Sequence, residues 1–273
     1  MKHLLKLLLS AVLLVHGSSF AQNLRSLLAT GNGITEQQVQ LDVSRQVRFN
    51  ASELKTLLGL HPNSDLVLKN TEADELGYMH YRYYQTYNGI PVENSMYIIH
   101  VLSGKITGLS GEIVLDFDNE MQSRMAISLT KEKAIENAIK HVNAKKYMWE
   151  NADREQELKN IKQAPGATYH PGAEMVWYSP GSNISPKDLK LVYKVDVYAA
   201  EPLSRAYYFI DVQTGSVLGK EELLHYIDAT GTANTAFSGT RTIHSDLYNG
   251  SYRLQDMTKG KGIITKHGDA IGK

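Results

Sequence analysis

The chain has 273 residues, and its 29 lysine and arginine residues equal its 29 aspartate and glutamate residues in number. A formal net charge of zero argues against a nucleic-acid-binding protein, which would carry a basic patch or stripe. The absence of cysteine excludes disulfide bonds, so core burial or bound ions must hold the fold.

The first 21 residues are predicted to form a signal peptide. They contain two lysines and an apolar run of about nine residues, Leu7 to Val15. This run is too short to span a bilayer, which takes roughly 20 residues. Ser19 and Ala21 are the small residues expected before a cut that leaves Gln22 first. We therefore expect an exported, soluble protein, secreted to the extracellular space or periplasm, with no membrane contact after the signal is removed.

Residues 22–127 are predicted to form a first unit that begins with a short helix. Asn50 is a capping residue, and Glu53 follows it three positions later, the spacing of a capping box. The leucines of Leu54 to Leu58 fall on one helical face, and Gly59 stands where the helix would end. The sequence therefore predicts a short amphipathic helix.

Three strands of an antiparallel meander are predicted after this helix. Turn residues separate them at Asn88-Gly89-Ile90-Pro91 and at Ser103-Gly104. The predicted strands are Tyr78–Tyr87, Val92–Leu102 and Lys105–Leu109.

Strand alternation divides the first of these strands into two faces. One face carries the side chains of Tyr81, Tyr83, Gln85 and Tyr87, and the other carries those of His80, Arg82, Tyr84 and Thr86. The pattern alone does not decide which face meets the core.

Residues 128–226 are predicted to form a second unit of similar plan. Thr130 can cap a helix, and Glu132 lies in its first turn, near the positive helix end. Apolar residues repeat at helical spacing at Ala134, Ile135, Ala138, Ile139 and Val142. Strands are predicted at Met175–Tyr178, Leu191–Tyr198 and Arg205–Val212, and the last hairpin turns at Thr214-Gly215. The expected fold class is therefore α+β, with a helix on an antiparallel sheet in each unit.

Three segments between these elements are expected to be surface turns or loops. Lys159–Pro171 and Ser179–Pro186 are rich in Pro, Gly, Ser and Asn and predict mobile loops. The acidic run Asp116–Glu120 lacks the glycine and the spacing of a calcium loop, so a solvated turn is the favoured interpretation.

The histidines show no pattern of a metal site. None of the ten is followed by glutamate, so the His-Glu-x-x-His zinc helix is missing. His80, His100, His170 and His244 could gather into a site, but no pair has ligand spacing on one element. We therefore expect strand or surface histidines, with no catalytic residue, no metal ligand and no cofactor in this chain.

Two blocks of sequence are specific enough to compare with known families. The first contains Asp74-Glu75-Leu76-Gly77, then Tyr81 to Val92, then His100. The second runs from Thr130 to Leu218 and ends on Phe209-Ile210-Asp211 followed by Thr214-Gly215. The first resembles the fungalysin/thermolysin propeptide domain, and the second resembles the PepSY domain that follows it in precursors of thermolysin-family zinc metallopeptidases. This resemblance implies cystatin-like units.

A third block, Tyr252 to Ile263, contains Leu-Gln-Asp-Met-Thr-Lys-Gly-Lys-Gly-Ile and resembles the first strands of the mature protease. Lys259 stands where the family has arginine, which loses a bidentate donor. The resemblance implies that residues 227–273 are the truncated start of a metallopeptidase domain whose catalytic centre lies beyond Lys273. Such a fragment lacks its sheet partners, so we expect it to be poorly packed or disordered.

The resemblance implies a propeptide that acts as intramolecular chaperone and temporary inhibitor. Its partner would be a thermolysin-like catalytic domain, in cis in the parent, which would hold zinc and calcium. Candidate residues for folding or for contact with that domain are Arg82, Gln85, Gly89 and Pro91, although Arg82 is also consistent with a solvated or intra-sheet ion pair.

Autoprocessing is predicted at the Tyr226–Ile227 bond, because thermolysin-like enzymes favour a bulky apolar residue after the scissile bond. Val217 to Ile227 is also consistent with an ordinary last strand and linker. The alternative function is a free-standing secreted protease inhibitor or binding module, and a structural envelope protein is a further class.

Overall fold

The computed structural model of the protein is strand-rich with few helices, so the predicted α+β class is confirmed. It describes residues 25–35, 37–117, 119–181, 184–224, 228–235, 238–248, 251–253, 255–256 and 263–264. Within these residues, no helix is long and apolar enough to cross a membrane.

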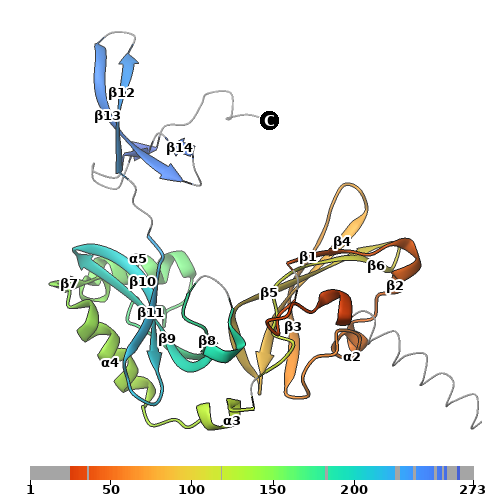
Figure 1. The fold of residues 1–273 in the computed structure, drawn as a ribbon. Helices are drawn as coiled ribbons and strands as arrows, with labels where there is room; N and C mark the ends of the chain where they lie inside the picture. The colour runs from red at the N-terminus through yellow and green to blue at the C-terminus, as the bar shows by residue number, and fades with distance from the viewer. Residues whose placement is uncertain are drawn as a thin grey trace, which may run out of the picture.

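The first unit is an antiparallel sheet with the strand order β3-β4-β5-β6-β1, and β2 also pairs with β6 (Figure 1). Its strands are β1 (Gln38–Gln40), β2 (Val47–Arg48), β3 (Ser64–Ala73), β4 (Tyr78–Tyr87), β5 (Ile90–Leu102) and β6 (Lys105–Gly111). Its short helical segments are η1 (Val43–Arg45), η2 (Ala51–Glu53) and α2 (Leu54–Leu57).

One face of this sheet is buried against the helical segment, as the leucine spacing predicted. Asn50 caps η2, its side chain accepting a hydrogen bond from the Ser52 backbone N–H at 3.2 Å. Leu54 and Leu58 are buried beside Tyr83 on the sheet. The core of this unit therefore lies on the face of β4 that carries Tyr81 and Tyr83, the choice that alternation left open. The other core members are Leu28, Leu41, Leu60, Tyr97, Ile99, Val101, Ile106, Leu109, Ile113 and Leu115. Tyr87 follows a register shift in β4 and is buried in the core of the second unit.

Both hairpin turns of this sheet form, but the first one consists of Asn88 and Gly89 only, because Ile90 and Pro91 already belong to β5. Asn88 and Gly89 have φ values of 51° and 75°, and Ser103 and Gly104 have φ values of 50° and 76°. Two consecutive residues with positive φ give a two-residue turn whose twist suits paired strands. Asparagine and glycine tolerate a positive φ, which is why Asn88, Gly89 and Gly104 indicated turns at these positions.

The second unit is a sheet in the order β8-β9-β10-β11, with helices packed beside it (Figure 1). Its strands are β7 (Lys146–Tyr147), β8 (Ala173–Tyr178), β9 (Lys190–Glu201), β10 (Leu203–Asp211) and β11 (Val217–Glu222). Its helical segments are α3 (Met121–Arg124), α4 (Lys131–Val142), η3 (Met148–Glu150), α5 (Ala152–Lys162) and η4 (Pro186–Asp188).

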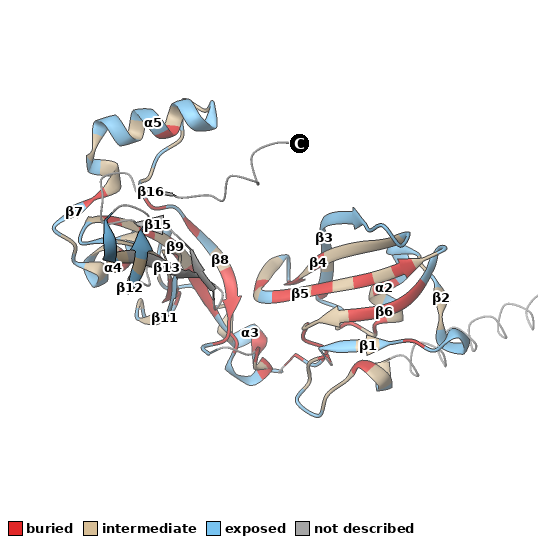
Figure 2. Ribbon diagram, turned by 90° about the horizontal axis from the view of Figure 1, so that it is seen from above, coloured by how far each residue is buried: buried red, intermediate tan, exposed pale blue. Residues whose placement is uncertain are grey.

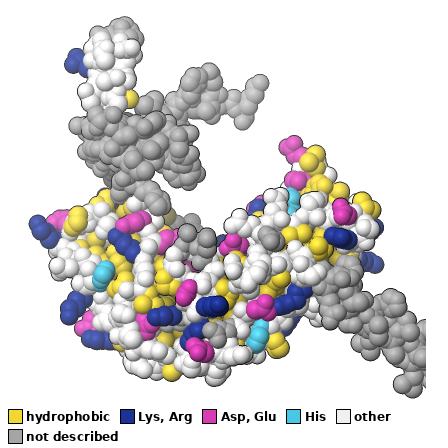
Figure 3. Space-filling model, in the orientation of Figure 1, with side chains coloured by type: hydrophobic (Ala, Val, Ile, Leu, Met, Phe, Trp, Pro, Cys, Tyr) yellow, Lys and Arg dark blue, Asp and Glu magenta, His cyan; other side chains and the backbone are white. Residues whose placement is uncertain are grey.

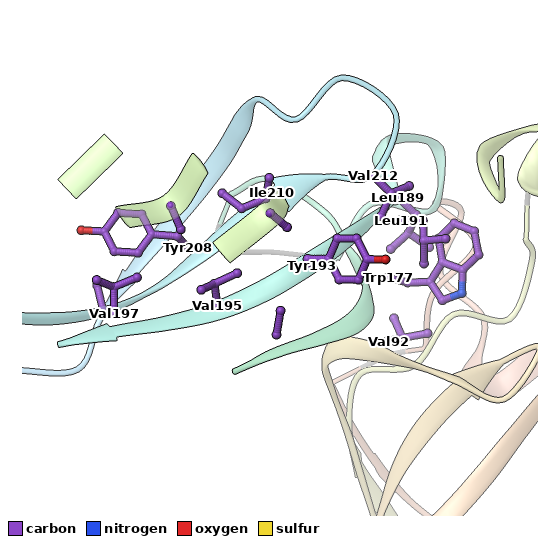
Figure 4. Close-up of a cluster of buried hydrophobic side chains, with 14 of the residues drawn as sticks. Val92, Trp177, Leu189, Leu191, Tyr193, Val195, Val197, Tyr208, Ile210 and Val212 are labelled. Carbon is purple, nitrogen blue, oxygen red and sulfur yellow. The ribbon is translucent and has the colours of Figure 1, made fainter. Parts of the chain in front are cut away.

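Helix α4 covers the core of this second sheet. Thr130 caps it by accepting a hydrogen bond from the Lys133 backbone N–H at 3.2 Å, as predicted. Ala134 and Ala138 are fully buried in a cluster with side chains of β8, β9 and β10, part of which is drawn in Figure 4. The small alanine side chains let the helix backbone approach the sheet closely.

Helix α5 and strand β3 are the two longest elements of these units that were not predicted from the sequence. The last four residues of helix α5, Lys159–Lys162, fall within the predicted loop Lys159–Pro171. The loop prediction was therefore wrong for these four residues. Only Leu158 of this helix is buried, and Figure 2 shows the rest of it largely exposed. Strand β3 is an edge strand whose side chains are almost all exposed. Neither element has an apolar stripe, which is the signal that periodicity analysis uses.

The two units are joined in one sheet. Strand β5 pairs in parallel with β8 through Val92 and Trp177, so all eleven strands from β1 to β11 are connected. Helix α2 spans only four residues. Two cystatin-like units are therefore not confirmed; the arrangement shown is a single continuous sheet with helical cover.

The last described strands are paired among themselves. They are β12 (Asp228–Thr235), β13 (Gly239–Tyr248), β14 (Ser251–Arg253), β15 (Gln255–Asp256) and β16 (Ile263–Ile264). β12, β13 and β14 form a three-stranded sheet, and β15 pairs with β16. The residues described in 231–235 and 238–243 are exposed or half-buried. The expectation of a poorly packed or disordered segment stays a prediction for residues 227–273.

Candidate functional site

Gln85 lies at the centre of a buried polar network at the end of β4. Its side-chain amide donates to Ser64 Oγ and to the Val114 carbonyl, each at 2.7 Å, and its Oε1 accepts from the Val114 N–H at 2.8 Å. The Gln85 backbone N–H donates to Ser95 Oγ at 3.0 Å. The side chain thus satisfies both backbone groups of Val114 as a neighbouring strand would. The structure places Gln85 as a residue that holds the fold.

Arg82 lies on the opposite, partly exposed face of the same strand. It forms an ion pair with Glu72 of β3 at 2.5 Å, which is the intra-sheet arrangement weighed in the sequence analysis. The Arg82 guanidinium lowers the pKa of the Glu72 carboxyl. A half-exposed pair of this kind contributes little stability, typically about 0–1 kcal/mol.

Gly89 and Pro91 lie in a groove at the corner between β4 and β5. The groove has a volume of about 610 Å³ and is open along the edge strand β3. Tyr84 and Thr86 of β4 and Lys55 of helix α2 also line it. An edge strand presents unpaired backbone groups, which can pair with an extended segment of another chain. The corner therefore combines free backbone groups with a surface depression.

The same corner holds the two units together. Trp177 is fully buried, and its Nε1 donates to the Tyr87 carbonyl at 3.1 Å. Glu93 of β5 pairs with Lys194 of β9 at 2.6 Å, with side chains only 15% and 13% exposed. Lys194 Nζ also lies 4.1 Å from the centre of the Tyr207 ring. These contacts fix one unit against the other.

Strand register brings together two of the four histidines that sequence spacing left scattered. His80 of β4 lies directly opposite His100 of β5, and their Nδ1 atoms are 2.8 Å apart. His170 lies in the second unit, beside Trp149. His244 is in β13, where its side chain is outside the described residues. Only the pairing of strands with a known register could have predicted the His80–His100 contact.

The acidic run has no metal-binding geometry among the residues described. Asp116 pairs with Arg25, Phe117 is buried, and Asp118 lies outside the described residues. Across the part of the chain that the structure describes, no group of three or more His, Asp or Glu side chains could hold a metal ion.

The predicted processing bond cannot be placed, because Tyr226 and Ile227 lie outside the described residues. Strand β11 ends at Glu222 and β12 begins at Asp228, so the bond falls between two described strands. Cleavage at this bond stays a prediction.

Charges are mixed on one face of the molecule. On the face drawn in Figure 3, positively and negatively charged side chains are interspersed over both units. That face presents no single-sign patch, so electrostatics do not mark a nucleic-acid surface there.

Comparisons with known proteins found one family motif and several relatives. Residues 64–113, which contain β3 to β6 and Gln85, match the fungalysin/thermolysin propeptide motif. The chain is 28% identical over 199 residues to a bacillolysin of Brevibacillus brevis, covering 72% of this chain and 33% of that protein. It is 25% identical over 267 residues to a bacillolysin of Bacillus subtilis (strain 168), covering 96% of this chain and 47% of that protein.

A thermolysin of Alicyclobacillus acidocaldarius is 28% identical over 227 residues, covering 77% of this chain and 38% of that protein. The chain thus spans less than half the length of these curated relatives. The chain is thus similar to part of bacillolysins and of a thermolysin, and it contains the fungalysin/thermolysin propeptide motif.

Proposed function

We propose that this chain is the propeptide region of a secreted thermolysin-like zinc metallopeptidase. Residues 1–21 act as a cleavable signal, residues 22–127 as the propeptide domain, residues 128–226 as a PepSY domain, and residues 227–273 as the start of the catalytic domain. Zinc and calcium are bound by the catalytic domain of the parent, and not by this chain. The propeptide motif at residues 64–113 is the observation that carries the proposal.

The chain acts as an intramolecular chaperone and temporary inhibitor of that catalytic domain. A covalently attached propeptide has a high effective concentration, so modest contacts are enough to hold it in place. The rigid corner between the units supports this role, because a preordered template loses little entropy when it binds. We assign contact with the catalytic domain to the corner groove with Gly89 and Pro91, and structural support to Gln85 and Arg82.

Addition in trans tests this function. The zinc-loaded catalytic domain of the parent is denatured and refolded with and without the chain, and activity on a peptide substrate is followed. We expect a higher refolding yield and inhibition of the folded enzyme at equimolar chain. No change in either quantity would contradict the proposal.

The alternative is a free-standing secreted inhibitor or binding module of cystatin-like fold. It would inhibit the folded enzyme without raising the yield of refolding. The same assay therefore separates the two functions, because only a propeptide is expected to change both quantities.

A further inference from the structure

A chain of four side chains crosses the outer face of the first sheet. Asp74 Oδ2 lies 3.2 Å from His80 Nε2, the two histidine Nδ1 atoms are 2.8 Å apart, and His100 Nε2 lies 2.8 Å from Ser110 Oγ. This row of hydrogen-bonded side chains links the β3–β4 turn, β4, β5 and β6. It lies on the face opposite the core and is not used in the proposed contacts.

The surroundings of the two rings are polar and partly closed. Glu72 and His100 lie opposite His80 in the register, and Gly108 lies opposite His100. Gly108 has no side chain, and a Cβ there would lie 3.6 Å from His100 Cδ2 and 2.9 Å from Gln40 Oε1. The Tyr78 ring stacks on His80, and Arg82 pairs with Glu72. The charged neighbours of the two rings are thus Asp74, Glu72 and Arg82.

The protons of the neutral pair can be placed from the partners. The hydrogen bond from the Tyr78 backbone N–H, followed by that from His80, lowers the pKa of Asp74, so the carboxylate is an acceptor and His80 Nε2 donates to it. His80 Nδ1 therefore accepts from His100 Nδ1, and His100 Nε2 accepts from the Ser110 hydroxyl. Each of the four side chains has a hydrogen-bond partner in this state.

One added proton can be accommodated, and two cannot. With one added proton, both nitrogens of the His80 ring donate, Nε2 to Asp74 and Nδ1 to His100 Nδ1. His100 then carries its own proton on Nε2 and donates it to Ser110. With two added protons, both Nδ1 atoms carry hydrogen and face each other across 2.8 Å. That contact is repulsive, and two positive rings are adjacent.

We propose that the His80–His100 pair is a proton-binding site that weakens the first sheet when both rings are protonated. This inference rests on the proposed function in one respect, namely that acidification would loosen the propeptide and weaken its binding to the catalytic domain. The hydrogen-bonding argument itself involves this chain alone.

The sign of the pH dependence follows from His100. Burial of its ring, and then the positive charges of His80 and Arg82, lower the pKa of His100. The unfolded chain keeps the ordinary histidine value of about 6.5 and so binds more protons as the pH falls. The contribution of neutral His100 to stability is complete above that value and is lost as the pH falls toward the folded-state pKa.

Urea unfolding of the full chain at about pH 8 and about pH 5, on either side of the ordinary histidine pKa, tests this linkage. We expect the urea midpoint of the wild type to fall on acidification, and the fall to shrink by about half or more in His100→Gln. His141→Gln, on α4 in the second unit, is the matched control and should keep the wild-type fall. The proposal is overturned if the urea midpoint of His100→Gln falls on acidification as much as that of the wild type.

Nitrogen-15 NMR of the wild type provides a test that does not depend on a variant folding. At about pH 8, we expect hydrogen on His80 Nε2 and on His100 Nδ1; the opposite placement would overturn the proposal. Equimolar zinc should leave both rings unchanged, whereas a saturable shift of both would make the pair a metal site instead. No protease takes part in these measurements, so their failure is distinguishable from failure of the proposed function.

Discussion

At the scale of single residues, the Gln85 side chain makes three buried hydrogen bonds in the first unit. Gln85→Leu removes three side-chain hydrogen bonds and leaves Ser64 and the backbone of Val114 without those partners. Each unsatisfied buried group costs roughly 1–3 kcal/mol, so we expect a loss of about 3 kcal/mol or more in the free energy of unfolding.

The matched control is Gln37→Leu. Gln37 is exposed and makes one side-chain hydrogen bond, to Glu112 at 2.8 Å. The same chemical change there should alter stability by less than about 0.5 kcal/mol. Urea unfolding of both variants measures the difference, and equal losses would show that the buried network does not stabilise the sheet.

The outer face of β4 shows what residue-level reasoning could and could not predict. Alternation correctly separated Arg82 from Gln85. It could not predict that Arg82 pairs with Glu72 or that His80 meets His100, because both contacts depend on the register of strands joined across the sheet. Register is set by turns and by burial of the whole face, which single positions do not reveal.

At the scale of elements, the helix caps of the second unit give a direct prediction. Thr130 accepts from the Lys133 N–H, and Asn151 accepts from the Asp153 and Arg154 N–H groups at 3.1 and 3.2 Å. Thr130→Ala and Asn151→Ala should each cost about 1 kcal/mol, because they leave first-turn N–H groups without that acceptor.

Thermal unfolding measures this loss, with Gln156→Ala on the exposed face of α5 as the control. Gln156 hydrogen-bonds only Asn160 at 3.0 Å among the contacts described, and alanine favours a helix. We expect a change within about 0.5 kcal/mol for this variant. A cap variant that behaves like the control would refute the role of that cap.

Elements with strong local signals were predicted, and elements held by tertiary context were not. The turns at Asn88-Gly89 and Ser103-Gly104 and the cap at Thr130 were read from residue type, and all three form. Helix α5 and strand β3 carry polar sequences, so their existence depends on neighbours rather than on periodicity. The parallel β5–β8 pairing was also missed, because it joins residues distant in sequence.

At the scale of the whole molecule, the Glu93–Lys194 pair should couple the stability of the two units. Lys194→Met leaves a nearly buried carboxylate without its partner, which typically costs about 3–5 kcal/mol. The exposed pair Arg154–Glu157 provides the control, since Arg154→Met should change stability by less than about 1 kcal/mol.

Hydrogen exchange in both units checks the coupling. In Lys194→Met we expect protection to fall in β4 and β5 of the first unit as well as in β9 and β10 of the second. A loss confined to the second unit would show that the junction does not transmit stability.

Processing of the intact precursor gives a further whole-molecule prediction. If the Tyr226–Ile227 bond is cut, mass spectrometry of the matured protein will find Ile227 as the new N-terminus. An N-terminus more than a few residues away would rule out this bond.

The refolding yield of the parent catalytic domain tests the central claim most directly. It is measured at equimolar wild-type chain, at equimolar Gln85→Leu chain, and without added chain. We predict a clear gain with the wild type and a smaller gain with the variant, because templating needs the folded first sheet. An equal yield in all three samples would contradict the account.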